Sequence, residues 1–290
     1  MGELWHRISL HRNTSGTVRF TVIALIASMG SGIAAGCSPR GNDALSPETL
    51  PEHPEIRRAY AQDKADWSPL HIAVLYDDKD EIRRLVRENA DLDATVPGSL
   101  WTPLDVAALY DKAETLAFLV EAWERARDAA YDYDRSLFLA VIHGNANAAR
   151  YLLERGGDPD TKSFDFEPQL RVAATHAHQA VMKVLLEYDV DVAATTASGL
   201  TALHGAAERG PEGVELLLRH GANVQVRANN GTTPLHVAAR HGQTEGAAVL
   251  LAAGADPSSR TVSGKTPLDL ARDRGHVSTL QLLEGAVRAP

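Results

Sequence analysis

A six-residue string that recurs about every 33 residues constrains this chain more than any other feature of its sequence. Its clearest copy, at 233–238, is Thr-Pro-Leu-His-Val-Ala. Every copy has a leucine with an alanine three positions later, and the leucines lie 32 to 34 residues apart. These leucines are Leu70, Leu104, Leu137, Leu170, Leu203, Leu235 and Leu268. A fixed period of this length predicts small units that bury their apolar faces only by stacking on one another.

The string also contains the residue types that begin a helix. Threonine is a helix N-cap because its side-chain oxygen accepts a bond from an unpaired backbone N–H, and proline suits the first helical position. The leucine is expected in the core, and the alanine lets the first helices of neighbouring units approach closely. Gly144, Gly210, Gly242 and Gly275 are predicted to end these first helices in the left-handed conformation that glycine tolerates.

Two further marks accompany the string. Leucine pairs such as Leu250-Leu251 follow several copies, and a turn such as Gly254-Ala255-Asp256 comes next. With these marks, residues 64–290 resemble the ankyrin repeat family. The resemblance implies an all-α ankyrin-repeat solenoid of about seven helix-turn-helix repeats with short finger turns. It also implies a domain that binds another protein through a concave surface.

Two repeats depart from the pattern. The second has no Gly-Ala-Asp turn, and residues 122–130 are mostly good helix formers. Its second helix is therefore predicted to be long, and its finger at 131–134 to be distorted. The fifth repeat is one residue short after Gly210, and Pro211 is predicted to begin its second helix.

The N-terminal segment differs in character from the repeats. Residues 1–36 resemble a signal peptide: arginines precede an apolar run at 20–27, which is too short to span a membrane, and small residues follow. Residues 33–37 resemble a bacterial lipobox, in which Cys37 would be lipidated, although Ala34 stands where leucine is usual. Ordinary cleavage before Cys37, leaving a free thiol, and an uncleaved N-terminal anchor are the alternatives. Residues 37–63 are rich in proline at their start and are predicted to be a flexible tether.

Composition excludes several classes of protein. The chain has 29 Lys and Arg against 38 Asp and Glu, a net charge of −9, which disfavours binding to nucleic acid. Its single cysteine permits neither an intrachain disulfide nor a cysteine-rich zinc site. No nucleotide-binding, metalloprotease or nucleophile-elbow motif is present in the sequence. We therefore expect no cofactor, no metal and no enzymatic activity.

The histidines are expected to have structural roles. His71, His204 and His236 occupy the same slot of the string, where the imidazole is predicted to bind the adjoining turn. His176 and His178 form an H-x-H pair, and on one helix two such side chains point about 200° apart. A zinc site at this pair is therefore not expected.

Candidate partner-binding residues follow from two register positions. In ankyrin-like proteins, partners contact the finger tips and the inner face of the first helices. The tip position, three before the motif leucine, gives Trp67, Trp101, Leu200, Thr232 and Lys265. The helix position, six after it, gives Tyr76, Tyr110, His143, His176, Arg209 and His241. We call these two sets the finger row and the helix row. Both change from aromatic residues near the N-terminal repeats to polar and cationic residues near the C-terminal repeats. Aromatic residues are enriched at binding hot spots, but Trp67 packed under 56–60 and Trp101 packed on its neighbouring finger are the alternatives.

The sequence thus predicts an exported, lipid-anchored protein that mediates protein–protein interaction in the bacterial envelope as a scaffold or assembly factor. It would be a monomer at the periplasmic face of the outer membrane if lipidated, and otherwise in the periplasm. An immunity or inhibitor protein that blocks a secreted toxin or envelope enzyme is the alternative, and an enzyme is a third. Specificity of binding lies in positions that are free to vary, so the partner itself is not predicted.

Overall fold

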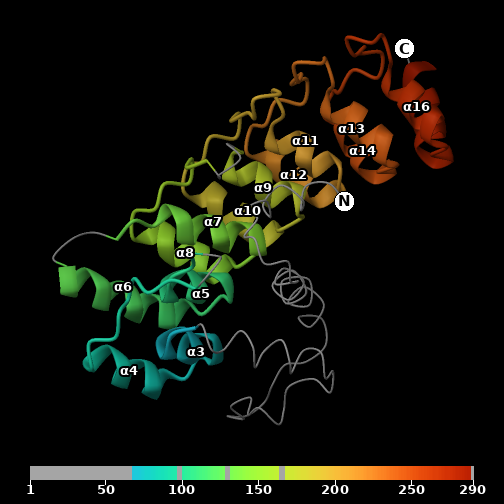
Figure 1. Ribbon diagram of the computed structural model, residues 1–290. Coiled ribbons are helices and arrows are strands. Elements are labelled where there is room, and N and C mark those ends of the chain that lie inside the picture. Colours follow the sequence, from blue (N-terminus) through green and yellow to red (C-terminus); the bar gives the residue numbers. More distant parts are fainter. Residues whose placement is uncertain (1–66, 97–99, 128–130, 163–166, 289–290) are drawn as a thin grey trace, which may run out of the picture. The chain divides into compact units, whose positions relative to one another are not determined.

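Seven consecutive helix pairs make up the described part of the repeat region in this computed structural model (Figure 1). The structure describes residues 67–96, 100–127, 131–162 and 167–288. The chain divides into two units, Met1–Ser68 and Pro69–Pro290, and all the described helices lie in the second. The predicted signal peptide, Cys37 and the tether lie outside the described residues.

Each pair consists of a short first helix and a second helix joined by a tight turn. The first helices are α3 (Pro69–Tyr76), α5 (Pro103–Leu109), α7 (Asp134–His143), α9 (Gln169–Thr175), α11 (Ala202–Ala207), α13 (Pro234–His241) and α15 (Pro267–Arg274). The second helices are α4 (Lys79–Arg87), α6 (Ala113–Arg127), α8 (Ala146–Glu154), α10 (Gln179–Glu187), α12 (Pro211–Arg219), α14 (Thr244–Ala252) and α16 (Val277–Arg288). The described residues contain no strand, and Lys162 and Pro168 form one isolated antiparallel bridge. The prediction of an all-α solenoid of seven helix pairs is confirmed.

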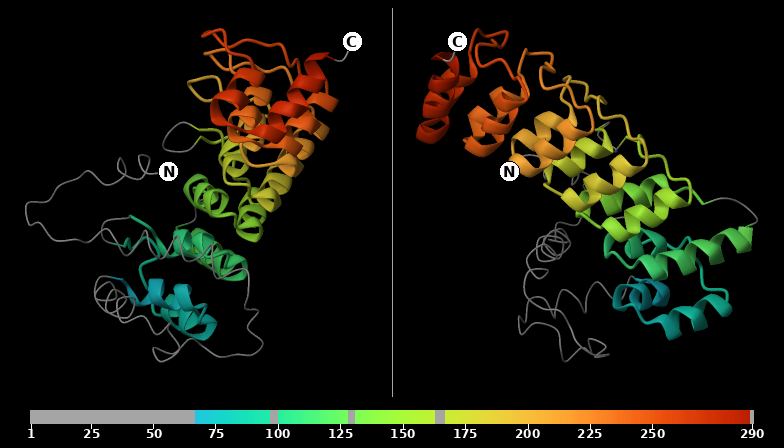
Figure 2. Two further views of the ribbon diagram at one scale, coloured as in Figure 1. Left: turned by 90° about the vertical axis from the view of Figure 1, so that its right-hand side faces the viewer. Right: turned by 180° about the vertical axis from the view of Figure 1, so that it is seen from behind.

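The repeats stack through both rows of helices (Figure 2). First helices contact first helices along the whole row, and second helices contact each other from α6 onward. All seven motif alanines are buried, with at most 4% of each exposed. Their small size permits this close packing, as predicted from the string.

Capping explains why the fourth position of the string is His or Asp. The Thr233 side chain accepts from the backbone N–H of His236 at 3.4 Å, and the Thr233 N–H donates back to His236 Nδ1 at 3.2 Å. Thr102 and Asp105 make the same reciprocal pair at 3.0 and 3.2 Å. This capping box satisfies two backbone donors that the start of a helix leaves unpaired.

The turn after the first helix confirms three of the four glycine predictions. Gly144, Gly242 and Gly275 cap α7, α13 and α15 in the left-handed conformation, with φ of 78°, 68° and 72°. The prediction for Gly210 is wrong, because this residue has φ 152° and ψ −175° and is the N-cap of α12. The missing residue of the fifth repeat removes the left-handed position itself, so that α11 ends at Ala207 and Pro211 begins α12 as predicted.

The second repeat has the long helix that its sequence predicts. Helix α6 contains 15 residues, more than any other described helix. Its C-terminal end is held by Asp93 of the first repeat, which accepts from Trp123 Nε1 at 2.7 Å and forms an ion pair with Arg127. The Arg127 guanidinium also lies 4.7 Å from the centre of the Trp123 ring. These contacts take the place of the turn that the second repeat lacks.

Candidate interaction surface

The predicted helix row lies where the first helices end. Tyr76, His143 and His241 are the last residues of α3, α7 and α13, and Tyr110 and His176 cap α5 and α9. Arg209 follows the C-cap of α11 by one residue. The members from the first three repeats are partly buried, whereas the later ones, His176, Arg209 and His241, are exposed. The row therefore offers polar and cationic groups to solvent more than aromatic ones.

The predicted finger row is not at the finger tips. The carbonyl oxygens of Trp101, Leu200, Thr232 and Lys265 accept from backbone N–H groups four or five residues earlier, at 2.9 to 3.0 Å. These residues therefore close the hairpin loops, and the placement at the tips is wrong. Trp101, Leu200 and Thr232 are partly buried and Lys265 is exposed. Trp67 is partly buried, and it belongs to the unit Met1–Ser68 and not to the unit that contains the repeats.

The true tips are residues that the register argument missed, and all but one of them are small or polar. They are Ala197, Ser198, Asn229, Asn230, Val262 and Ser263, all of them exposed. Val262 is 80% exposed. Each tip ends at a glycine with positive φ (Gly199, Gly231 or Gly264), and this glycine in the sequence is the signal that places the tip.

The three string histidines connect each repeat to the next finger, as predicted. Nε2 of His71, His204 and His236 lies 3.0 to 3.1 Å from the carbonyl oxygens of Trp101, Thr232 and Lys265. A carbonyl only accepts, so each Nε2 carries the proton and donates it. Burial lowers the pKa of all three imidazoles, which keeps them neutral and buried in this role. They are not available to a partner.

The H-x-H pair has a different geometry from the one expected. His176 is the C-cap of α9 and His178 is the N-cap of α10, so the two are not on one helix. Their rings stack, with centroids 5.7 Å apart and planes 13° from parallel. Each has one ring nitrogen committed to a carbonyl: His176 Nδ1 to Val172 at 2.9 Å and His178 Nε2 to Ile142 at 3.0 Å. No group of three or more candidate ligands for a metal ion occurs among the residues that the structure describes.

His143 lies beside this pair at the end of α7. Burial first, and then the charges of His178 and His176, lower its pKa to about 4. A neutral imidazole is therefore kept in the middle of the predicted row at physiological pH.

Arginines dominate the same row farther along the chain. Arg209 donates from Nε to the carbonyl of Thr175 at 2.5 Å, which ties the shortened fifth repeat to the fourth. Arg240 donates from Nε to His241 Nε2 at 3.3 Å, and His241 Nδ1 lies 4.0 Å from Glu208. Burial lowers the pKa of His241, Glu208 raises it, and Arg240, Arg274 and Arg209 lower it. The three arginines are thus electrostatic neighbours of one imidazole.

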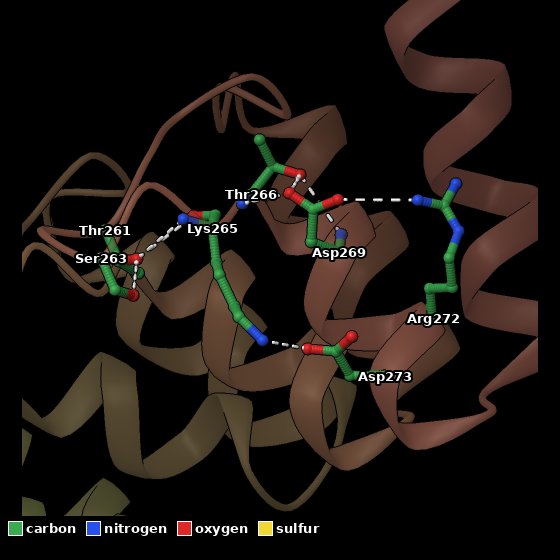
Figure 3. A network of polar contacts seen from close by, with 7 residues as sticks. All are labelled: Thr261, Ser263, Lys265, Thr266, Asp269, Arg272 and Asp273. Carbon is green, nitrogen blue, oxygen red and sulfur yellow. Dashed lines mark hydrogen bonds and ion pairs between the residues drawn. The ribbon is translucent and has the colours of Figure 1, made fainter.

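The last repeat contains ion pairs of its own (Figure 3). Lys265 pairs with Asp273, and Arg272 lies 3.6 Å from Asp269. Asp269 also accepts from the N–H and hydroxyl of Thr266, at 2.9 and 2.8 Å. Lys265, a predicted partner contact, is therefore engaged within its own repeat.

Two of the surface hollows show how little enclosed space the helix pairs leave. One, of about 70 Å³, lies between α4 and α6, and another, of about 30 Å³, lies where α10 meets α12. A site that encloses a small-molecule ligand measures roughly 300 Å³ or more. Neither hollow provides such a site, and none of the helices described here has the length and apolar character needed to cross a bilayer.

The geometry defines a class of protein, a linear array of helix-turn-helix repeats with projecting fingers. Comparison with family models identifies the array: a model of ankyrin repeats in three copies matches residues 137–228, 170–261 and 228–286, and a single ankyrin repeat model matches 65–96. The chain belongs to the ankyrin repeat family. Ankyrin repeats are protein–protein interaction scaffolds, and such proteins are typically non-enzymatic interaction modules. The matched segments leave out 97–136, which contains the repeat with the long α6.

Proposed function

We propose that this protein is an exported, lipid-anchored ankyrin-repeat protein that binds another protein in the bacterial envelope as a scaffold or assembly factor. Membership of the ankyrin repeat family carries the interaction role. The resemblance of residues 1–36 to a signal peptide and of 33–37 to a lipobox supports export and lipidation at Cys37. A lipid on Cys37 would keep the repeats at a membrane surface and raise their local concentration.

The partner is proposed to lie along the ends of the first helices, on the concave surface of a monomer. The observation that supports this position is a consistent register: the residues six after the motif leucine are exposed or only partly buried, while the string histidines and alanines are buried. Tyr76 and Tyr110 would supply the aromatic contacts, and His176, Arg209 and His241 the polar ones.

Export is tested by replacing the cysteine. We expect the full chain to be labelled by a fatty-acid analogue and to fractionate with membranes. Cys37→Ser should abolish the label and release the protein into the soluble periplasmic fraction. A full-length, unprocessed chain in the cytoplasm would contradict both export and lipidation.

The binding face is tested by affinity capture from envelope extract with the full chain as bait. Tyr76→Ala combined with Tyr110→Ala should reduce recovery of a captured protein by far more than it lowers the melting temperature. A control pair on the second-helix face, Lys183→Ala with Arg219→Ala, should leave recovery unchanged. Equal recovery by both pairs, or a loss that follows the melting temperature, would refute the proposed face.

The role of the captured protein separates the scaffold from the inhibitor. An immunity or inhibitor protein binds one partner tightly in a one-to-one complex and abolishes its activity. A scaffold leaves the activity of the captured protein intact.

A further inference from the structure

The charge at the ends of α11, α13 and α15 is opposite to the charge of the chain. The whole sequence has a net charge of −9. However, Arg209, Arg240 and Arg274 are all exposed, and they lie at or next to the ends of three first helices, each of which packs against the next. All three arginines also lower the pKa of His241. Like charges placed together repel one another, so an exposed group of three arginines in an acidic protein needs an explanation beyond solubility.

Nearby acids do not neutralise this group. Figure 3 shows that Asp273 pairs with Lys265 and that Asp269 faces Arg272. The ion-pair contact of Glu208 is with His241, at 4.0 Å. In the part of the chain that the structure describes, the guanidinium groups of Arg240 and Arg274 have no carboxylate within ion-pair distance. Lys265 and Arg272 are thus paired with acids, whereas Arg240 and Arg274 present their guanidinium groups to solvent.

The spacing of the arginines suggests the form of the ligand. They come from three successive repeats, and packed helices lie about 8–10 Å apart. A polypeptide in the polyproline II conformation advances about 3.1 Å per residue with three residues per turn, so acidic residues three positions apart lie on one side of it at about the same interval. Guanidinium groups also bind carboxylates in a two-pronged geometry that a lysine cannot reproduce.

We propose that Arg209, Arg240 and Arg274 bind an extended, acidic segment of a protein partner. The inference rests on the proposed function, and it specifies the chemistry of the partner at the C-terminal half of the row. A protein ligand is favoured over a phosphate-rich one because the same row continues into Tyr110 and the partly buried His143, which suit side chains and not phosphates. The acidic remainder of the chain also opposes approach to a polyanionic surface.

The test measures binding of a labelled 12-residue peptide with glutamate at every third position, by fluorescence anisotropy with the full chain. The matched ligand has glutamine in place of glutamate. Arg240→Glu combined with Arg274→Glu should weaken binding of the acidic peptide by about tenfold or more, and increasing salt should weaken binding to the unchanged chain. The control, Lys183→Glu with Arg219→Glu, alters net charge equally on the second-helix face and should leave the affinity unchanged. The milder Arg240→Gln with Arg274→Gln should give a smaller loss in the same direction, which excludes misfolding as its cause.

Several results would overturn the inference. These are equal weakening by both charge-reversed pairs, no binding of the acidic peptide, and equal binding of the glutamine peptide. Arginine-dependent binding that is stronger for phosphatidylglycerol vesicles or a single-stranded oligonucleotide would assign the arginines to a different ligand class. If the captured partner still binds the Arg240→Glu, Arg274→Glu protein, this inference fails while the proposed interaction role stands. If no protein is captured through the first-helix face, the proposed role fails independently of the peptide result.

Discussion

The neutral, partly buried His143 makes the stability of the repeats depend on pH in a way that can be calculated. Its pKa in the folded protein is about 4, against 6.5 for an unperturbed histidine. The unfolded chain therefore binds a proton at a higher pH than the folded chain does. Stability is complete above about pH 6.5 and falls as the pH decreases toward about 4, because protonation then favours the unfolded state.

The size of the effect follows from the difference between the two pKa values. At about pH 5, an unfolded histidine is almost fully protonated while His143 is still mostly neutral, and the difference costs about 2 kcal/mol. Partial exposure of the ring reduces this figure, so about 1–2 kcal/mol is expected in measurement. That is a substantial part of the 5–15 kcal/mol that holds a typical domain folded.

The test uses urea unfolding of the full chain, followed by far-ultraviolet circular dichroism at about pH 7.5 and about pH 5. His143→Gln and His143→Phe both remove the titrating group but differ in polarity and packing. Each should reduce the loss of stability between the two pH values by about 1–2 kcal/mol, whatever its stability at neutral pH. If both variants lose as much stability on acidification as the unchanged chain, His143 is not held neutral by its surroundings and the reasoning is refuted.

Four further substitutions test the packing between repeats, each by urea unfolding. Helix propensity alone predicts a gain from Gly205→Ala, but the new Cβ would lie 2.6 Å from Thr175 Oγ1, so we expect a loss of about 1–3 kcal/mol; a measured gain would contradict this close approach. Gly144→Ala places a Cβ 2.6 Å from a histidine ring at a φ of 78° and should lose about as much, whereas no loss would show that the ring moves freely. Thr233→Ala removes the cap of α13 and should cost about 1 kcal/mol, and an unchanged midpoint would mean that the capping box adds nothing. Arg209→Gln breaks the bond from Nε to the Thr175 carbonyl and should cost about 1 kcal/mol, and a neutral result would show that this bond adds nothing to stability.

The regular parts of the fold could be predicted from the sequence because a single constraint repeats in it. A leucine and an alanine at one spacing recur in all seven repeats, so the pairing of helices and the burial of the alanines follow directly. The length of α6 was also predictable, because good helix formers replace the residues of a turn. At these positions the local helix propensity and the packing between repeats favour the same structure.

The turns could not be predicted in the same detail. His176 and His178 look like neighbours on one helix, but a left-handed Ala177 separates two helices there and brings the rings together. Gly210 occupies the expected slot, yet one missing residue changes its backbone conformation and leaves Arg209 to bridge to the previous repeat. Counting residues from a motif leucine predicts positions correctly along the helix that contains it. Across a turn the count fails, because the number and conformation of the turn residues vary. For the same reason the finger row, counted back from the leucine, does not lie at the tips.

The stacking order of the repeats has a mechanical consequence. Each helix pair contacts only its neighbours, so tension applied from the N-terminal side enters through α3 and α4 and passes along the array in series. A hollow of about 70 Å³ lies at the junction of α4 and α6 in this first part of the array. A pull strong enough to unravel one 33-residue unit would lengthen the molecule by roughly 100 Å. Under such a pull the array would lengthen stepwise, one repeat after another, like an extensible spring.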